Sequence, residues 1–203
     1  MADLDLLPRS ALDGLLQPGR YGLTAGAPGA VLREEAGWRI ASVAARRGQK
    51  AALAAAAREA WGVELPVVPR HEGDARLGFL WAGPEQWLAL APDAPAPLEQ
   101  ELRGKLGGLA SVAEQGDGRV VLHLSGPRAR DLLAKLVAVD LHPRAFRVGD
   151  TAITLAAHIG MQLWQVEAAP AYRLLAFRGF AGSLSAAIVA AGEEYGIEVL
   201  ARG

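Results

Sequence analysis

The sequence has no cysteine and no excess of positive charge, and each absence excludes a class of protein. Its 203 residues carry 21 Lys and Arg against 22 Asp and Glu, which gives a formal net charge of −1. Without cysteine, the chain has no disulfides, no thiolate metal sites and no cysteine nucleophile. Without a basic excess, nucleic acids and anionic membrane surfaces are poor partners. We therefore expect no nucleic-acid partner.

Targeting and membrane-spanning signals are also missing. The first ten residues are acidic and do not show the basic-then-apolar order of a signal peptide. The longest uncharged run, residues 151–166, is too short to cross a bilayer as a helix. We expect a protein with no membrane partner that resides in the cytoplasm.

Motifs that carry catalysis are absent too. Histidine pairs at the i, i+2 or i, i+4 spacing of metal ligands do not occur among His71, His123, His142 and His158. No Gly-x-Ser-x-Gly elbow is present, and no dinucleotide-binding fingerprint follows a predicted strand. Carboxylates such as Glu34 and Glu35 are adjacent in sequence, whereas acid–base catalysis needs groups opposed in a cleft. We predict no catalytic, cofactor-binding or metal-binding residue in this chain.

Residues 119–148 form the most informative stretch. Residues 119–124 alternate like a half-buried strand, Ser125-Gly126-Pro127 turns the chain, and a helix follows. Its apolar stripe is made of Ala129, Leu132, Leu133, Leu136 and Val137. The Gly-Pro turn invites a phosphate-site hypothesis, but Pro127 removes a backbone donor and no Lys-Ser/Thr pair follows. We interpret the turn as a structural junction.

Two parts of the chain show a similar order of elements. In the first, we predict a strand at 38–44, a helix at 49–61, a hairpin at 77–81 and 87–90, a helix around 98–106 and a strand at 109–113. In the second, we predict after the 119–138 unit a hairpin at 151–157 and 161–166 that turns at Gly160, a strand at 172–177, a helix at 180–195 and a strand at 197–200. The first reads β-α-β-β-α-β, and the second has one extra strand.

These orders predict an α+β fold made of two tandem ferredoxin-like (split βαβ) halves. We expect an irregular N-terminal arm at 1–36, a first half at 37–116 and a second half at 117–203, which together form one compact domain. The arm is either packed on its own domain or laid over a partner subunit, and the sequence leaves both alternatives open.

Four residues are candidates for a partner interface. Trp38 is one of five tryptophans, and tryptophan is a common interface anchor, although core packing is its usual role. Arg128 lies on the polar side of the central helix. His142 and Arg144, with Pro143 between them, follow that helix and form either a polar contact surface or a solvated loop.

Several ordered segments resemble the gamma subunit of the heterotetrameric sarcosine oxidases. They are VLREEAGWRIASVAARRG, LGFLWAGPEQWLAL, RVVLHLSGPRARDLLAKLVAVDLHPRAF and YRLLAFRGFAGSLSAAIVAAGEEYG. The DLHPRAF run is the more specific part, while the Gly-Pro-x-Ala piece is shared with the wider folate-binding aminomethyltransferase superfamily. The resemblance extends from about Val31 onward, and it does not include the arm.

The resemblance implies an aminomethyltransferase-like fold in an assembly of alpha, beta, gamma and delta subunits that oxidatively demethylates sarcosine to glycine. That reaction yields hydrogen peroxide and can pass the methylene carbon to tetrahydrofolate. The FAD, FMN, NAD, zinc and tetrahydrofolate that the family uses are implied for the other subunits. The gamma chain packs on alpha, and the resemblance carries over no catalytic residue.

Other functions remain open at this point. The chain is alternatively a subunit of a related N-methyl amino acid dehydrogenase, such as one acting on N-methylglutamate. It is alternatively a free-standing folate-binding protein, either an aminomethyl carrier or a helper in RNA modification, or a generic interaction module. An exposed apolar patch favours a subunit or an interaction module, and a deep polar-rimmed pocket favours the folate-binding protein.

Overall fold

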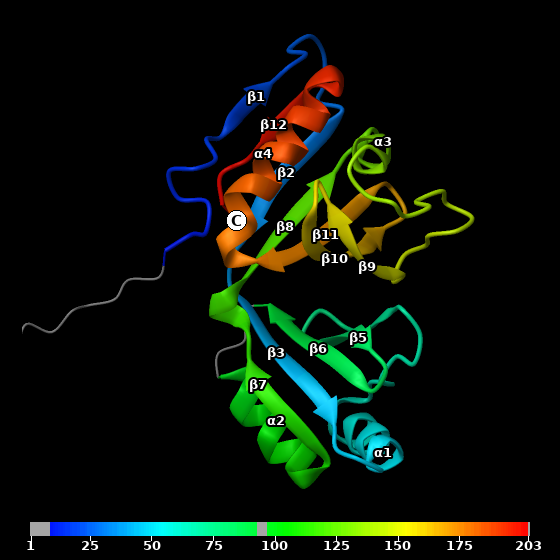
Figure 1. Cartoon of the computed structure of the whole chain (residues 1–203). Coiled ribbons are helices and arrows are strands. Elements are labelled where there is room, and N and C mark those ends of the chain that lie inside the picture. Colours follow the sequence, from blue (N-terminus) through cyan, green and yellow to red (C-terminus); the bar gives the residue numbers. More distant parts are fainter. Residues whose placement is uncertain (1–8, 93–96, 203) are drawn as a thin grey trace, which may run out of the picture.

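Two β-sheets pack face to face, and helices cover their outer faces (Figure 1). The structure is a computed structural model, and it describes residues 9–92 and 97–202. One sheet has five strands in the order β4-β5-β6-β3-β7, and the other has seven in the order β1-β12-β2-β8-β11-β10-β9. The α+β prediction is confirmed, and the layers run helix, sheet, sheet, helix.

The five-stranded half follows the predicted pattern closely. It contains β3 (Trp38–Ala45), α1 (Lys50–Trp61), β4 (His71–Gly73), β5 (Gly78–Gly83), β6 (Gln86–Pro92), α2 (Leu98–Leu106) and β7 (Ala110–Glu114). Helix α1 ends at Gly62, whose φ of 69° and N–H bond to the Arg58 carbonyl make a left-handed cap. Leu98, Leu102 and Leu106 form the buried stripe of α2. Neighbouring strands in this sheet are antiparallel throughout.

The seven-stranded half contains the remaining elements. They are β8 (Arg119–Ser125), α3 (Ala129–Ala134), β9 (Thr151–Ala156), β10 (Ile159–Glu167), β11 (Ala171–Phe177), α4 (Ala181–Gly192) and β12 (Ile197–Val199). Short 3-10 turns occur at η1 (Gly107–Leu109), η2 (Gly116–Gly118), η3 (Arg178–Phe180) and η4 (Glu193–Tyr195). The helix predicted at 180–195 is therefore α4 flanked by η3 and η4.

The expectation of an irregular arm at 1–36 is wrong for two segments. Residues of the arm form β1 (Gly19–Tyr21) and β2 (Ala30–Glu35), and β2 lies between β8 and β12 inside the seven-stranded sheet. Ala30 and Leu32 are fully buried against the helices. Only two apolar residues alternate before charged ones follow, so the local pattern was too short to predict a strand. This part of the arm packs on its own chain, while residues 1–8 lie outside the described range.

Two further expectations need correction. A short strand, β4, gives the first half the same β-α-β-β-β-α-β order as the second, so the predicted extra strand does not distinguish them. In the second half β2 separates β8 from β12, a departure from a simple split βαβ arrangement. The β9–β10 turn is made by Ala157 and His158, with φ values of 47° and 68°, whereas Gly160 lies inside β10.

The space between the sheets is only partly filled by large side chains. Leu80, Leu88 and Leu90 from one sheet meet Val121, Trp164 and Leu175 from the other, with Ile40 among them. On the inner face of β3 the side chains change from Trp38 and Ile40 to Ser42 and Ala44 along the strand. The sheets are therefore filled at one end of β3, and the small residues leave room at the other.

Candidate partner surface at the sheet junction

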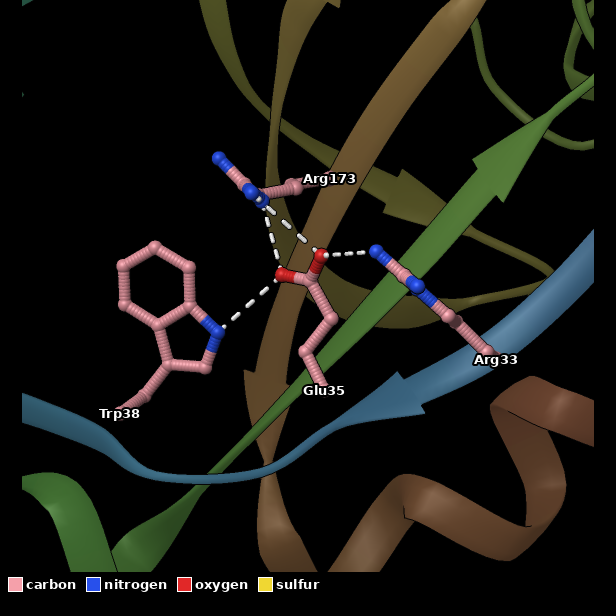
Figure 2. A network of polar contacts seen from close by, with 4 residues as sticks. All are labelled: Arg33, Glu35, Trp38 and Arg173. Carbon is pink, nitrogen blue, oxygen red and sulfur yellow. Dashed lines mark hydrogen bonds and ion pairs between the residues drawn. The ribbon is translucent and has the colours of Figure 1, made fainter. Parts of the chain in front are cut away.

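A carboxylate surrounded by nitrogen donors ties β2, β3 and β11 together (Figure 2). Glu35 Oε2 accepts hydrogen bonds from Arg173 Nε at 2.7 Å and from Trp38 Nε1 at 3.1 Å. Its Oε1 accepts from Arg33 Nη2 at 3.3 Å and from Arg173 Nη2 at 3.4 Å. The Arg173 guanidinium also lies 5.0 Å from the centroid of the Trp38 ring. These contacts fix the chain where it passes from β2 of the seven-stranded sheet into β3 of the five-stranded sheet.

The charges around Glu35 keep it ionised. Burial alone would raise the pKa of this carboxyl group, whose side chain is 10% exposed. The hydrogen bond and charge of Arg173, the charge of His123 and the Trp38 N–H outweigh burial and bring the pKa below its ordinary value. The pKa of His123 is lowered by burial, which the charge of Glu35 partly offsets.

This arrangement suits structure better than catalysis. A general base needs a free lone pair and a pKa near the working pH, whereas both Glu35 oxygens already accept hydrogen bonds from cationic groups. The other acid on this strand, Glu34, faces the opposite side and hydrogen-bonds Ser10 and the Ala11 N–H. The two carboxylates therefore do not form an opposed pair.

A second tie joins the halves on the far side of the junction. Arg70 Nη1 donates to Asp150 Oδ1 at 2.8 Å, and the His71 N–H donates to the Gly149 carbonyl at 2.7 Å. The His71 ring stacks on Trp164 with centroids 6.4 Å apart. Burial is the main cause that lowers the pKa of His71. The two halves are thus fastened at two separated places.

Away from these ties, toward the end of β3 that carries small side chains, an open apolar groove of about 630 Å³ remains. Ser42 and Ala44 of β3 lie along one side, and Ile153 and Leu155 of β9 lie along the other. Both β9 side chains are 57% exposed, and Phe177 at the end of β11 is 51% exposed. Exposed apolar side chains gathered along one groove are typical of an interaction surface.

Arg119 is the charged residue of this groove. Its guanidinium lies 3.8 Å from the centroid of the Phe177 ring, and its Nε is buried without a hydrogen-bond partner in the described part of the chain. Arg119 also lines a neighbouring polar hollow of about 750 Å³ around residues 34–40. Burial lowers its pKa from a very high starting value, so it remains a cation.

The four predicted interface residues lie in different places. Trp38 belongs to the Glu35 cluster and lines the polar hollow. Arg128 precedes α3, forms an ion pair with Asp131 at 3.1 Å and covers the Tyr195 ring. His142 and Arg144 lie together in the exposed loop after α3, where the Arg144 N–H donates to His142 Nδ1 at 3.2 Å. The structure brings the last two together but not the four, and their interface role stays a prediction.

Sequence reasoning missed the residues of the groove. Ile153 and Leu155 alternate on a predicted strand, and the Phe177 that covers Arg119 ends another. The available signal is that the strand containing Ile153 and Leu155 carries apolar residues on both faces. Only one of these faces is covered by elements of the same half, so the apolar residues on the other face need another partner. No local pattern connects Glu35 with Arg173, which lies 138 residues away in the chain.

Across residues 9–92 and 97–202, no group of three His, Asp or Glu side chains is placed to hold a metal ion. None of the helices in these ranges has the length and apolar character needed to cross a membrane.

Comparisons with known proteins identify the family. The model of the "Sarcosine oxidase, gamma subunit family" matches residues 47–185. The sarcosine oxidase subunit gamma of Arthrobacter sp. is 40% identical over 165 residues, which cover 78% of this chain and 77% of that protein. The subunit gamma of Corynebacterium sp. strain P-1 is 42% identical over 117 residues, which cover 55% of this chain and 56% of the relative.

Solved structures agree with this relationship. A chain of the heterotetrameric sarcosine oxidase from Corynebacterium sp. U-96 is 35% identical, with a TM-score of 0.75 over 84% of this chain and 87% of the other. The glycine cleavage system aminomethyltransferase T from Bartonella henselae is 14% identical, with a TM-score of 0.62 over 85% of this chain and 48% of that one, and it shows the fold alone. From the family match and the extent of the Arthrobacter alignment, the chain belongs to the sarcosine oxidase gamma subunit family.

Proposed function

We propose that this chain is the non-catalytic gamma subunit of a heterotetrameric, flavin-dependent sarcosine oxidase. In this proposal the complex demethylates sarcosine to glycine with formation of hydrogen peroxide and methylene-tetrahydrofolate. The gamma chain packs on the alpha subunit and stabilises it, and the beta and delta subunits complete the assembly.

The similarity to a chain of the Corynebacterium heterotetramer carries the proposal, because it spans most of both chains. The geometry is consistent with it. The titratable cluster at the sheet junction holds an ionised Glu35 among cationic donors, while the open groove presents apolar side chains to the outside. A subunit that contributes packing needs such a surface more than it needs a catalytic acid.

The proposal also assigns the cofactors. FAD, FMN, NAD, zinc and tetrahydrofolate belong to the other subunits, and the alpha subunit is the most direct partner of this chain. Cytoplasmic residence of the assembly stays a prediction, which cell fractionation would check.

Affinity purification from the native cell tests the proposal. A tag on this chain should bring down three partner subunits in equal amounts, with the absorbance spectrum of bound flavin. The purified assembly should consume oxygen when sarcosine is added. A colourless preparation of this chain alone that binds folate would contradict the proposal.

The same preparation identifies the substrate. Oxygen consumption with sarcosine supports the main proposal, whereas dehydrogenation of N-methylglutamate without oxygen consumption would identify a related dehydrogenase. The names of the relatives favour sarcosine, since the Arthrobacter and Corynebacterium strain P-1 relatives are both sarcosine oxidase subunits.

A further inference from the structure

The groove at the sheet junction arises from the sequence of β3. Trp38 and Ile40 reach across to the second sheet, but Ser42 and Ala44 are too small to do so. Strand β9 of the other sheet also lines the groove and exposes Ile153 and Leu155 there, although leaving such side chains in water is unfavourable. Both sheets therefore contribute apolar side chains to the groove, but these side chains do not pack against each other and stay exposed.

Arg119 gives this groove a charge preference. The guanidinium is held against the Phe177 ring, its Nε is buried, and no salt bridge to it forms among the described residues. By contrast, Arg173 on the same face of the sheet is bound to Glu35 through two nitrogen atoms. A partly buried cation without an acid is costly alone and gains most from an incoming carboxylate.

The rim of the groove suits an extended peptide. Ile153 and Leu155 are two residues apart on a strand, so their side chains are separated by about 7 Å. That spacing matches alternate side chains of a second extended chain laid along β9. The volume of about 630 Å³ lies within the usual range of small-molecule and peptide sites.

We propose that the groove receives an extended segment of a neighbouring oxidase subunit, whose apolar side chains pack on Ile153, Leu155 and Phe177 and whose carboxylate pairs with Arg119. This inference rests on the proposed function and adds to it the surface and the chemistry of the contact. The carboxylate belongs to an Asp, a Glu or the C-terminus of the segment.

Binding of this chain to the complex of the other three subunits tests the proposal. We expect Arg119→Gln to weaken that binding roughly 10- to 30-fold, because it leaves the partner carboxylate buried without a cation. Ile153→Asp should weaken it by a similar factor by placing a second negative charge in the groove. Ile153 is more than half exposed, so this variant folds even where Arg119→Gln does not.

The matched control is Arg47→Gln, which removes an exposed arginine from the turn after β3 and should change the affinity by less than about twofold. Tight binding by the wild type with unchanged binding by both groove variants would overturn the groove proposal and leave the subunit function intact. Failure of the wild-type chain to bind the other subunits would contradict the proposed function itself.

Photo-crosslinking identifies the occupant directly. A benzophenone amino acid at position 155 of the assembled complex should crosslink to a peptide of another subunit that contains an acidic residue or the C-terminus. A crosslink to a second copy of this chain would overturn the proposal. Absence of any crosslink, or a small anionic molecule that co-purifies and is lost on Arg119→Gln, would overturn it as well.

Discussion

Two arginines on the same face of the seven-stranded sheet have opposite surroundings. Arg173 donates to Glu35 at 2.7 Å and lies over the Trp38 ring. Arg119 lies over the Phe177 ring, but within the described part of the chain it has no carboxylate partner. Arg173 thus contacts both an aromatic ring and a carboxylate of its own chain. Arg119 contacts an aromatic ring but, among the described residues, no carboxylate.

The difference shows how one sheet junction serves two purposes. At the Glu35 end, the carboxylate is paired with Arg173 and large side chains fill the space between the sheets, so this end holds the halves together. At the Arg119 end, small residues on β3 leave the groove open. Stability should therefore depend on the first end and assembly on the second.

The largest expected effect on stability comes from the filled part of the junction. Trp164 is 1% exposed and packs between the sheets, so Trp164→Ala should lower the free energy of unfolding by about 3–5 kcal/mol. Urea denaturation of the isolated chain measures this. Phe177→Ala, at the open groove, is the control and should cost less than about 1 kcal/mol. Equal costs at the two positions would remove the distinction between the ends.

The next effect concerns the ion pair. Arg173→Ala leaves the Glu35 carboxylate, 10% exposed, without its main partner and should cost about 2–3 kcal/mol of unfolding free energy. Arg33→Ala removes a longer contact from a more exposed side chain and should cost less than about 1 kcal/mol. The same denaturation series compares them, and a larger loss from Arg33→Ala would contradict the assignment of Arg173 as the central donor.

A pH series sharpens this prediction. The folded-state pKa of Glu35 is lowered, so its ionised form stabilises the fold above the unfolded value of about 4.3. That contribution is lost as the pH falls through the lower folded pKa. The unfolding free energy of Glu35→Gln should therefore change less than that of the wild type below about pH 4.3. Parallel curves for the two proteins would show that Glu35 is not responsible.

The smallest expected effect is at the open end. Arg119→Gln should change the unfolding free energy of the isolated chain by no more than about 0.5 kcal/mol, because no salt bridge in the described residues is lost. Thermal unfolding of both proteins in one buffer measures the difference. A loss as large as that of Arg173→Ala would mean that Arg119 already has an internal partner.

The sequence predicts local structure well where short-range patterns decide it. The helices predicted at 49–61 and around 98–106 depend on residues a few positions apart, and both are confirmed as α1 and α2. The strand predicted at 38–44 is confirmed as β3, but the groove beside Ser42 and Ala44 depends on the facing sheet, which no local pattern indicates.

Local sequence patterns do not predict contacts between segments that are distant in the chain. Strand β2 pairs with β8 and β12, which lie roughly ninety residues or more further along the chain. Its six residues show no strand pattern by themselves, because the strand depends on these distant partners. The sequence predicts the β9–β10 turn at Gly160, but the register of the strands places it at Ala157 and His158. The Glu35 and Arg173 pair has no signal in either local segment.

Hydroxyl-radical footprinting of this chain, free and in the assembled oxidase, tests the central claim most directly. Our account predicts that oxidation of Ile153, Leu155 and Phe177 falls several-fold on assembly, since each is more than half exposed in the free chain. Oxidation of Trp164, which is already buried between the sheets, should change little. Unchanged oxidation of all three groove residues, with protection elsewhere on the chain, would contradict the account.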